Sequence, residues 1–379
     1  MKRQVKRMNK SYTRRLFSWR GELYDAAGSE RLFRQAVREN TEFHFRHNAA
    51  YRRISMRFSM GSEPVPIPAA FLKEHPLWTL RPHKLPFRVT SSGTGGKKTN
   101  LGFCFSDAVR GARMTHAIVK YHKILSPRPA VCLMMSFAPR PDDPVMIAKT
   151  QAVTSFFAPP VRRVYALKDG GHGRPLINRD GLLRALRFAM ALRLPVRIIG
   201  FPFYTYFFLL YLKKHGLRFA LPGGSMVLLG GGWKGFHGDA PKREQLLELI
   251  QDRLGIPPDQ YREFFGAAEH PSLYCACKNG HFHVPVYSRA AVLDVNTLKP
   301  LPYGKPGLLN LISPLAKGMP LTSILTGDLA VMHEGKECGC GISAPYFTLL
   351  GRAEAGTEKT CAADAAVLLQ GGLGYGTKP

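Results

Sequence analysis

Apolar and polar positions follow two different periods along most of the chain. From about Leu85 onward, short apolar runs at Ala130–Phe137, Val196–Gly200 and 225–229 have the length and composition of buried strands. Between them, apolar residues recur at helical spacing. This spacing predicts helices over 106–125, 181–194, 203–216 and 244–254, of which 181–194 is basic and amphipathic. Alternation of strands and helices at these intervals predicts an α/β core with buried parallel strands.

The flanking parts of the chain have other patterns. Residues 87–91 predict a strand that runs into a glycine-rich turn, 321–325 predict another strand, and short strands return from Tyr274 onward. The first 60 residues mix basic and aromatic side chains at helical spacing, and they predict helices that end before the proline-rich residues 64–68. A solvated helical face explains their charge better than a nucleic-acid-binding arm, because no known nucleic-acid-binding motif accompanies it.

Composition narrows the class of protein. The chain has 379 residues, of which 45% are hydrophobic and 21% charged, so it is globular, and its length suggests two or three domains or one large core with an appendage. The net charge of +28 favours an acidic partner, which could be nucleic acid, an anionic membrane, nucleotide phosphate or an acidic protein. Residues 1–60 contain 15 Lys and Arg and only 5 Asp and Glu.

Membrane and cysteine patterns favour a cytoplasmic protein. The longest uncharged apolar stretch, 198–212, has 15 residues. A spanning helix needs about 20, so no transmembrane segment is expected. The basic start is not followed by the apolar run of a signal peptide. Four of the seven cysteines form two Cys-x-Cys pairs, a pattern that suits thiols or a metal site in a reducing compartment.

One loop has the composition of a phosphate-binding site. Its small residues let backbone amides approach phosphate oxygens, while its hydroxyls and lysines add donors and positive charge. It lacks the glycine spacing and the GK[ST] ending of a Walker A loop, and a plain surface turn stays possible. The loop reads Thr90-Ser91-Ser92-Gly93-Thr94-Gly95-Gly96-Lys97-Lys98-Thr99.

Further motifs follow this loop in a fixed order. They are Gly230-Gly231-Gly232-Trp233-Lys234, Phe265-Gly266-Ala267-Ala268-Glu269, Thr326-Gly327-Asp328-Leu329 and Gly351-Arg352. The ordered set resembles the adenylate-forming superfamily, and within it the LuxE-type acyl-protein synthetases of bacterial fatty-acid reductase systems. The closer likeness lies in 230–235, in 269–283, in Pro302-Tyr303-Gly304-Lys305-Pro306-Gly307 and in Cys338-Gly339-Cys340-Gly341. It covers roughly residues 80–365.

The resemblance implies a fold and a division of the chain. The expected fold is α/β, with a large acyl-CoA-synthetase-like N-terminal domain of parallel-sheet α/β layers and a truncated C-terminal domain. Residues 1–80 would form a basic helical N-terminal region and 81–350 the adenylate-forming core. Residues 351–379 would form a vestigial C-terminal segment, in place of the mobile domain of about a hundred residues that superfamily ligases usually carry.

The resemblance also implies ATP and Mg²⁺ as cofactors. The loop residues Ser91, Ser92, Gly93, Thr94, Gly95, Lys97 and Lys98, with Gly231 and Gly232, would hold the triphosphate. Glu269 would bind the Mg²⁺, Asp328 the ribose hydroxyls, and Arg352 the edge of the nucleotide. Lys97, Lys98 and Lys234 are equal candidates to replace the catalytic lysine of the usual C-terminal domain. Taken one at a time, Asp328 could cap a turn, Glu269 could be a surface acid and Arg352 a solvated cation.

A cysteine near the end of the chain matches the acyl acceptor of the acyl-protein branch. This residue is Cys361, and Lys359 two positions before it could lower the pKa of its thiol. A buried structural cysteine is the alternative.

The paired cysteines predict a separate metal site. Cys275, Cys277, Cys338 and Cys340 could hold a structural Zn²⁺ in tetrahedral geometry, with His281 or His283 competing for one position. Related phenylacetate-CoA ligases carry a similar cluster. Four unligated thiols are the alternative.

The predicted function is ATP-dependent activation of a fatty acid to acyl-adenylate and transfer to Cys361, for delivery to a partner such as an acyl reductase. The alternative is an acyl- or aryl-CoA ligase, or a carrier-protein ligase, of the phenylacetate-CoA ligase type. A nucleic-acid-binding protein explains the charge but none of the ordered motifs, and a scaffold subunit active only within a reductase complex is a further possibility. The aromatic residues between Phe201 and Tyr211 are typical of a core helix, and with Trp233 they could also line an acyl pocket, because such a tunnel is built from core-type residues.

Overall fold

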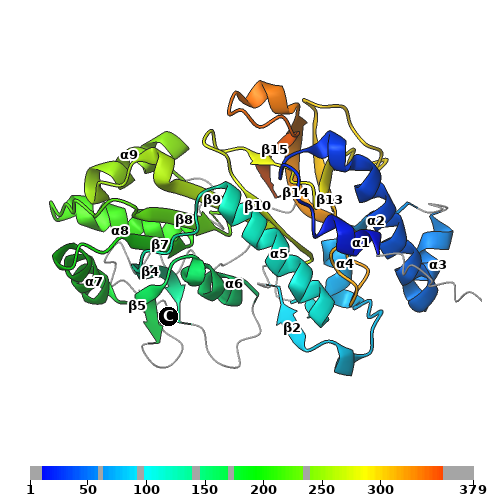
Figure 1. Cartoon of the computed structure of the whole chain (residues 1–379), viewed down its shortest axis with the longest axis horizontal. Coiled ribbons are helices and arrows are strands. Elements are labelled where there is room, and N and C mark those ends of the chain that lie inside the picture. Colours follow the sequence, from blue (N-terminus) through cyan, green and yellow to red (C-terminus); the bar gives the residue numbers. More distant parts are fainter. Residues whose placement is uncertain are drawn as a thin grey trace, which may run out of the picture.

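A sheet of seven strands forms the half of the molecule that is built from the middle of the chain (Figure 1). The computed structural model describes residues 11–58, 63–91, 98–138, 146–169, 175–233 and 240–352. The five inner strands of the sheet run parallel, and an antiparallel strand closes each edge. In sheet order the strands are β10 (His270–Cys275), β9 (Tyr261–Ala267), β8 (Met226–Gly230), β7 (Val196–Gly200), β4 (Ala130–Phe137), β5 (Pro160–Asp169) and β6 (Pro175–Ile177).

Helices cover both faces of this sheet. On one face, a layer of helices packs on Val131, Leu133 and Ile198; it consists of α7 (Arg179–Ala191), α8 (Pro202–Lys214) and α9 (Arg243–Leu254). On the other face, α5 (Phe105–Tyr121) contributes Met114 and Ile118 to a second cluster. Because both faces are covered, the inner strands are apolar on both sides, as expected of parallel sheets. The short helix α6 (Met146–Thr154) contacts β4 and β7.

A second sheet of six strands lies beside the first. Phe347 of the second sheet packs against Phe265 and Tyr274 of the first, with ring centroids 5.4 and 5.3 Å apart. In sheet order its strands are β11 (Phe282–His283), β15 (Tyr346–Arg352), β14 (Ser323–His333), β13 (Pro306–Ile312) and β12 (Arg289–Leu293), with β1 (Ile67–Pro68) paired to β14. A separate hairpin consists of β2 (Phe87–Thr90) and β3 (Asn100–Phe103).

Helices from the beginning of the chain pack against the second sheet and α5 (Figure 1). They are α1 (Tyr12–Leu16), α2 (Ala26–His47), α3 (Ala49–Arg57) and α4 (Ala69–Glu74). The longest of them, α2, starts where the side chain of Asp25 accepts a hydrogen bond from the backbone N–H of Gly28. This contact satisfies one of the free donors at the start of the helix. Four 3-10 turns complete the described elements: η1 (Pro82–Lys84), η2 (Ser155–Phe157), η3 (Pro258–Gln260) and η4 (Gly335–Cys338).

The buried carboxylate of Asp107 joins α5 to the loop 315–318 of the second sheet. One of its oxygens accepts hydrogen bonds from Arg110 Nη2 at 2.5 Å and from the backbone N–H of Lys317 at 3.0 Å. The other accepts from the backbone N–H groups of Cys104 at 3.0 Å and Gly318 at 3.1 Å. A fully buried carboxylate is stable only when it is paired and hydrogen-bonded in this way.

The same loop also receives the N-terminal helices. Its Ala316 carbonyl accepts hydrogen bonds from Asn40 Nδ2 at 2.8 Å and His44 Nε2 at 3.2 Å, both from α2. Its Gly318 carbonyl accepts from the backbone N–H groups of Thr79 and Leu80. Loop 315–318 therefore connects α2, α5 and the segment before the β2–β3 hairpin.

The predicted helix and strand positions are largely confirmed. The strands at Ala130–Phe137 and Val196–Gly200 have the predicted bounds, and the other predicted elements from 87 to 254 are shifted by a few residues at their ends. The N-terminal helices are also confirmed, and the strand expected at 321–325 overlaps only the first three residues of a longer one, β14. The prediction missed the strands β1, β3, β5, β6 and β9 and the helices α4 and α6. In β5, exposed Arg162 and Arg163 interrupt the apolar pattern at the edge of the parallel region.

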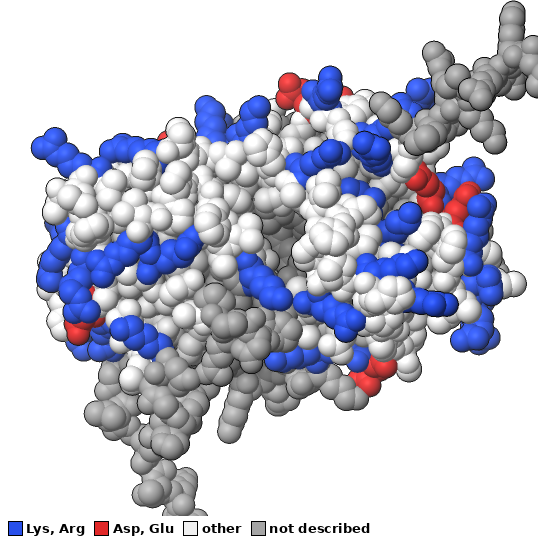
Figure 2. All heavy atoms as spheres, turned by 60° about the horizontal axis from the view of Figure 1, so that its bottom comes forward, with Lys and Arg blue, Asp and Glu red and all other residues white. Residues whose placement is uncertain are grey.

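The surface is predominantly basic. Figure 2 shows Lys and Arg side chains over much of the visible face, with few acidic ones. Within the described ranges, each helix is too short or too polar to cross a lipid bilayer.

We expect Asp107→Ala to lower the free energy of unfolding by about 3–5 kcal/mol, because it leaves Arg110 and two loop N–H groups buried without their acceptor. Urea titration followed by circular dichroism measures the loss. Asp259→Ala, which removes an exposed acid, is the control and should change stability by less than about 0.5 kcal/mol. Equal stability of the two variants would contradict the role given to Asp107.

Candidate functional site

The base of the predicted phosphate loop is closed by a reciprocal pair of hydrogen bonds. The backbone N–H of Ser91 donates to the Thr99 carbonyl at 3.0 Å, and the N–H of Thr99 donates to Ser91 Oγ at 2.9 Å. Both residues are buried, and they continue the β2–β3 ladder beyond Thr90. The two ends of the loop are therefore held side by side. Lys98 lies at this base and is exposed.

Thr99 also connects the loop to Glu269. Its hydroxyl donates a hydrogen bond of 2.5 Å to Glu269 Oε1, across 170 residues of sequence. Glu269 is only 7% exposed and lies in the turn between β9 and β10. The neighbouring Ala268 packs on the cluster that contains Leu101 of β3 and Ile324 of β14. A buried carboxylate thus lies at the foot of the phosphate loop, where both sheets and the hairpin meet.

The glycine motif follows the parallel strand next to β9. Gly230 ends β8 and pairs with Phe264 of β9, and Gly231 and Gly232 come directly after it with φ of +90° and +67°. These angles favour glycine, because other residues rarely adopt them. Since β8 and β9 are parallel, Gly231, Gly232 and Glu269 all follow the carboxyl ends of neighbouring strands. This edge is where open α/β sheets bind their ligands.

Asp328 and Arg352 pair on the second sheet. They face each other in the register of β14 and β15, and Arg352 Nε lies 3.3 Å from Asp328 Oδ1. Asp328 is mostly buried, whereas the Arg352 side chain is more than half exposed. Burial raises the pKa of the Asp328 carboxyl above its ordinary value, and the charge of Arg352 partly opposes this shift. The pair offers a carboxylate acceptor beside a cation.

Several predicted site residues lie outside the described residues. They are Ser92, Gly93, Thr94, Gly95, Lys97, Lys234 and Cys361.

Three cysteines and a histidine come together between the two sheets and η4. The ligand atoms of Cys277, His283, Cys338 and Cys340 all lie within 4.8 Å of one another. His283 donates from Nδ1 to the Ala344 carbonyl at 2.7 Å, which leaves Nε2 as the ring's lone-pair nitrogen, 3.2 Å from Cys340 Sγ. A carbonyl that fixes the tautomer and orientation in this way is usual behind metal-bound histidines.

This group differs from the predicted ligand set by two residues. It takes His283, the competing candidate, in place of His281, and it does not include Cys275. Cys275 ends β10 as a fully buried side chain, and burial raises the pKa of its thiol. The chain then turns, and the N–H of Cys277 bonds the carbonyl of His281. His281 lies at the edge of the group, with Nδ1 3.1 Å from Cys338 Sγ and its ring stacked on Tyr346.

Three thiols and an imidazole suit zinc. Zn²⁺ prefers sulfur and nitrogen ligands in tetrahedral geometry, and Cys₃His sites are a common structural type. Carboxylates, which suit Mg²⁺ and Ca²⁺, are absent from this group among the described residues.

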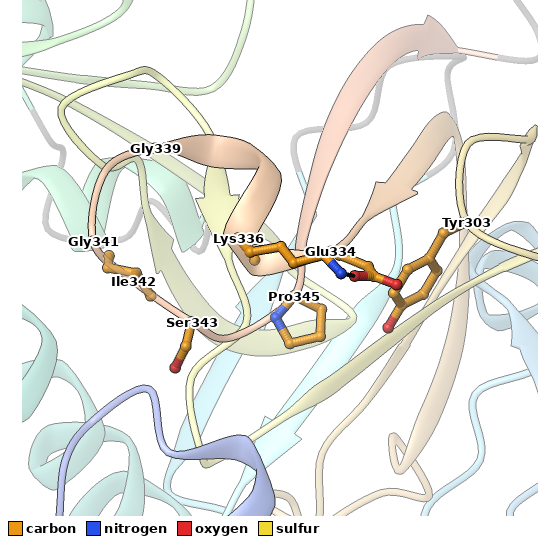
Figure 3. Close-up of a pocket in the computed structure, with 9 residues that line it drawn as sticks. Tyr303, Glu334, Lys336, Gly339, Gly341, Ile342, Ser343 and Pro345 are labelled. Atoms are coloured by element: carbon orange, nitrogen blue, oxygen red, sulfur yellow. Dashed lines mark ion pairs between the residues drawn. The ribbon is translucent and has the colours of Figure 1, made fainter.

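We call Cys277, His283, Cys338 and Cys340 the Cys/His group. The lining of an open groove of about 590 Å³ includes Gly339 and Gly341, the neighbours of Cys340 in the sequence (Figure 3). Tyr303 lies at one end, near the ion pair between Glu334 and Lys336, and the loop that contains Gly339 and Gly341 lies at the other. Among the described residues, those predicted to bind nucleotide are not part of the groove's lining.

The aromatic run forms a core helix. Phe203, Tyr204, Phe207 and Phe208 of α8 are buried against the seven-stranded sheet. Tyr206 is partly buried and meets Trp233 edge to face, with ring centroids 5.8 Å apart. The core interpretation is confirmed for these side chains; the described residues leave the acyl-pocket hypothesis untested.

The amino-acid sequence matches a known protein family and two curated relatives. The family model described as "Acyl-protein synthetase, LuxE" matches residues 16–369. A long-chain-fatty-acid–luciferin-component ligase of Aliivibrio fischeri is 28% identical over 178 residues, which are 46% of this chain and 46% of the relative. A ligase of the same name from Vibrio harveyi is 27% identical over 138 residues, 36% of each chain. The matched region thus spans less than half of either curated relative.

Solved structures share the fold. A 2-hydroxyisobutyryl-CoA ligase crystallised in an open conformation with 2-HIB-AMP and CoA aligns with a TM-score of 0.64 at 14% identity, covering 89% of this chain and 78% of that one. The same ligase in its postadenylation state aligns with a TM-score of 0.63 at 15% identity, covering 88% and 69%. The predicted adenylate-forming α/β fold is therefore confirmed.

We expect Asp328→Asn to raise the free energy of unfolding at neutral pH. A carboxyl whose pKa is higher in the folded than in the unfolded state destabilises the fold once the pH exceeds both values. The gain should shrink as the pH falls toward about 4, because the wild-type carboxyl is then also neutral. Urea titrations over this pH range measure it, with Asp259→Asn at an exposed acid as the control. A variant that is less stable at neutral pH would contradict the expectation.

Proposed function

Because the chain belongs to the LuxE acyl-protein synthetase family, we propose that it activates a fatty acid with ATP and transfers the acyl group to a cysteine of the protein. The observation that carries the proposal is the contact between Thr99 and Glu269, which joins the foot of the phosphate loop to a buried carboxylate at the carboxyl edge of the sheet. A nucleoside triphosphate needs amide donors for its phosphate oxygens, and its metal ion needs a carboxylate close to them.

Each described residue has a role in the first step. The loop above Ser91 would hold the phosphates, with Lys98 as an added cation, and the turn at Gly231 and Gly232 would border them. Glu269 would hold Mg²⁺, a hard ion that binds carboxylate oxygen, and the ion would neutralise charge on the phosphate oxygens. Asp328 would accept hydrogen bonds from the ribose hydroxyls, with Arg352 beside it.

The chemistry has two steps. A carboxylate oxygen of the fatty acid attacks the α-phosphorus of ATP, forming acyl-adenylate as pyrophosphate leaves. A cysteine thiolate then attacks the acyl carbonyl, a thioester forms, and AMP leaves with the electron pair of the broken C–O bond. We propose Cys361 as this cysteine from its place in the sequence motif, and an acyl reductase as the partner that receives the acyl group. Residues 81–350 would then be the catalytic core.

Pyrophosphate exchange separates activation from transfer. We expect acid-dependent ATP–pyrophosphate exchange in the wild-type protein and in Cys361→Ser, with stable acylation, read by mass spectrometry, only in the wild type. Glu269→Gln should lower exchange by about 100-fold, since it removes the charge proposed to hold the metal. The matched control, Glu248→Gln on the exposed face of α9, should leave it unchanged.

Other outcomes would redirect the proposal. Loss of exchange in Cys361→Ser would show that this cysteine supports structure or adenylation. Quantitative product on coenzyme A without acylation of the protein would favour a CoA ligase. Absence of exchange with every acid in a panel of chain lengths would overturn the proposed function.

We also propose that Cys277, His283, Cys338 and Cys340 hold a structural Zn²⁺. The ion would fasten the turn after β10 to η4, two segments about sixty residues apart in the sequence, without taking part in the reaction. His283, fixed by Ala344, would bind through Nε2.

Metal analysis tests the zinc site. We expect about one zinc per chain in the wild type, far less in Cys340→Ser, and an unchanged content in Cys275→Ala, which removes a neighbouring buried thiol outside the group. Titration of native thiols gives a second measure that does not depend on variants, because chelation should expose additional reactive cysteines. Zinc-free protein from zinc-containing medium would contradict the site.

A further inference from the structure

The outer face of α7 is basic. Its inner face, with Leu182, Leu183 and Leu186, packs on the seven-stranded sheet. Arg184 and Arg187 are exposed on the opposite side, and exposed Arg193 follows the helix. From the adjoining strand β5, the guanidinium of Arg162 lies 5.6 Å from the ring of Phe188 on α7. We call the set Arg162, Arg184, Arg187, Met190, Leu192 and Arg193 the α7 patch.

The sequence that follows the first turn of α7 is free of acids. Residues 181–238 contain eight Lys and Arg and no Asp or Glu, although the whole chain has 26 acidic residues. The exposed acidic side chains of this helical layer are Asp180 in the first turn of α7 and Glu244, Glu248 and Asp252 on α9. In Figure 2 basic side chains run across the half of the molecule that carries α7. On α7 the acid is Asp180, four residues before Arg184, and α8 has none, so acids on these two helices offset only part of the positive charge of the patch.

Apolar side chains lie among these arginines. Met190 is 39% and Leu192 56% exposed, and they stand between Arg187 and Arg193 in the sequence. Exposed apolar side chains among cations are typical of helices that lie flat on an anionic membrane, where apolar groups enter the headgroup boundary and arginines reach the phosphates. Nucleic acid would pair with the arginines but would leave Met190 and Leu192 without a function.

We propose that the α7 patch docks this protein onto an anionic phospholipid bilayer. The helix lies along the outside of the sheet at one end of the molecule, so it can meet a flat surface without a change of fold (Figure 1). Docking goes beyond the proposed acyl chemistry and does not rest on it. It would place a fatty-acid-activating enzyme at a surface where long-chain acids dissolve.

Vesicle flotation tests the proposal on the full-length protein. We expect binding to vesicles of phosphatidylcholine with 30 mol% phosphatidylglycerol, no binding to pure phosphatidylcholine, and release at about 0.5 M salt, where charge is screened over a few ångströms. Arg184→Ala/Arg187→Ala should lower the partition coefficient by about 25-fold, at about fivefold per arginine near an anionic surface. Met190→Ser/Leu192→Ser should lower it with no change in the salt dependence.

A charge-matched variant makes the test specific. Arg34→Ala/Arg38→Ala removes two exposed arginines from α2, which has no large exposed apolar side chain and lies away from the α7 patch in Figure 1, and should leave binding within twofold of the wild type. Equal losses in the two arginine variants would overturn the proposal, because binding would then follow net charge alone. The proposal would be overturned in favour of nucleic acid if Met190→Ser/Leu192→Ser left vesicle binding unchanged and a DNA duplex displaced the protein from the vesicles. Absence of binding to the anionic vesicles would also overturn it.

Two further measurements keep the outcome clear. Melting curves show whether each variant is folded. Pyrophosphate exchange without vesicles reports the proposed function separately, so either proposal can fail alone.

Discussion

The buried carboxylate of Asp107 is the constraint on which much of this structure depends. Four donors converge on it, and two of them are backbone N–H groups of the loop 315–318. A buried carboxylate is compatible with a stable fold only if every hydrogen-bond partner is in place, since an unpaired charge in the interior costs several kcal/mol. The loop is thereby limited to one position, and its carbonyls can serve as fixed acceptors for α2 and for the segment before β2.

The position of the phosphate loop follows from this fixed point. Gly318 lies against β3 so closely that a Cβ on it would be 2.4 Å from the Gly102 carbonyl. Gly102 in turn directs its N–H to Met319 Sδ at 3.4 Å. The strand held in this way begins directly after Thr99, which closes the loop with Ser91 and reaches Glu269. A continuous set of contacts thus leads from a structural acid to the acid proposed to bind metal.

The sequence was sufficient for the parts of the fold whose patterns are local. Apolar runs such as Val196–Gly200 identified the buried parallel strands, and helical spacing identified the layers over them. Strand β5 was missed, because the arginines on its exposed positions hide its period. The motif order indicated Ser91 and Glu269 individually. The hydroxyl that joins them belongs to Thr99, whose partner lies 170 residues away, and no local pattern reveals such a contact.

The Cys/His group shows the same limit in its ligands. Spacing alone treated Cys275 and Cys277 as equals and left His281 and His283 in competition. Cys275 and Cys277 differ because strand β10 ends at Cys275. The Cys275 side chain stays in the core, and the turn after it brings Cys277 Sγ close to Cys338 Sγ. His283 belongs to the group, and the Ala344 carbonyl orients its ring.

Two contacts of the second sheet join polar residues that are far apart in the sequence: Asp107 with loop 315–318, and the Cys/His group. In both, bringing the residues together costs chain entropy. Lys317 and Asp107 are 210 positions apart, and Cys338 and Cys277 are 61 apart. Closing such loops costs free energy that grows slowly with their length. At Asp107 a cation from the protein, Arg110, balances the buried charge. The Cys/His group has thiols that would have to stay protonated to avoid mutual repulsion, unless a divalent cation draws them together as thiolates. The comparison favours a bound metal as the counterpart of Arg110 in the Cys/His group.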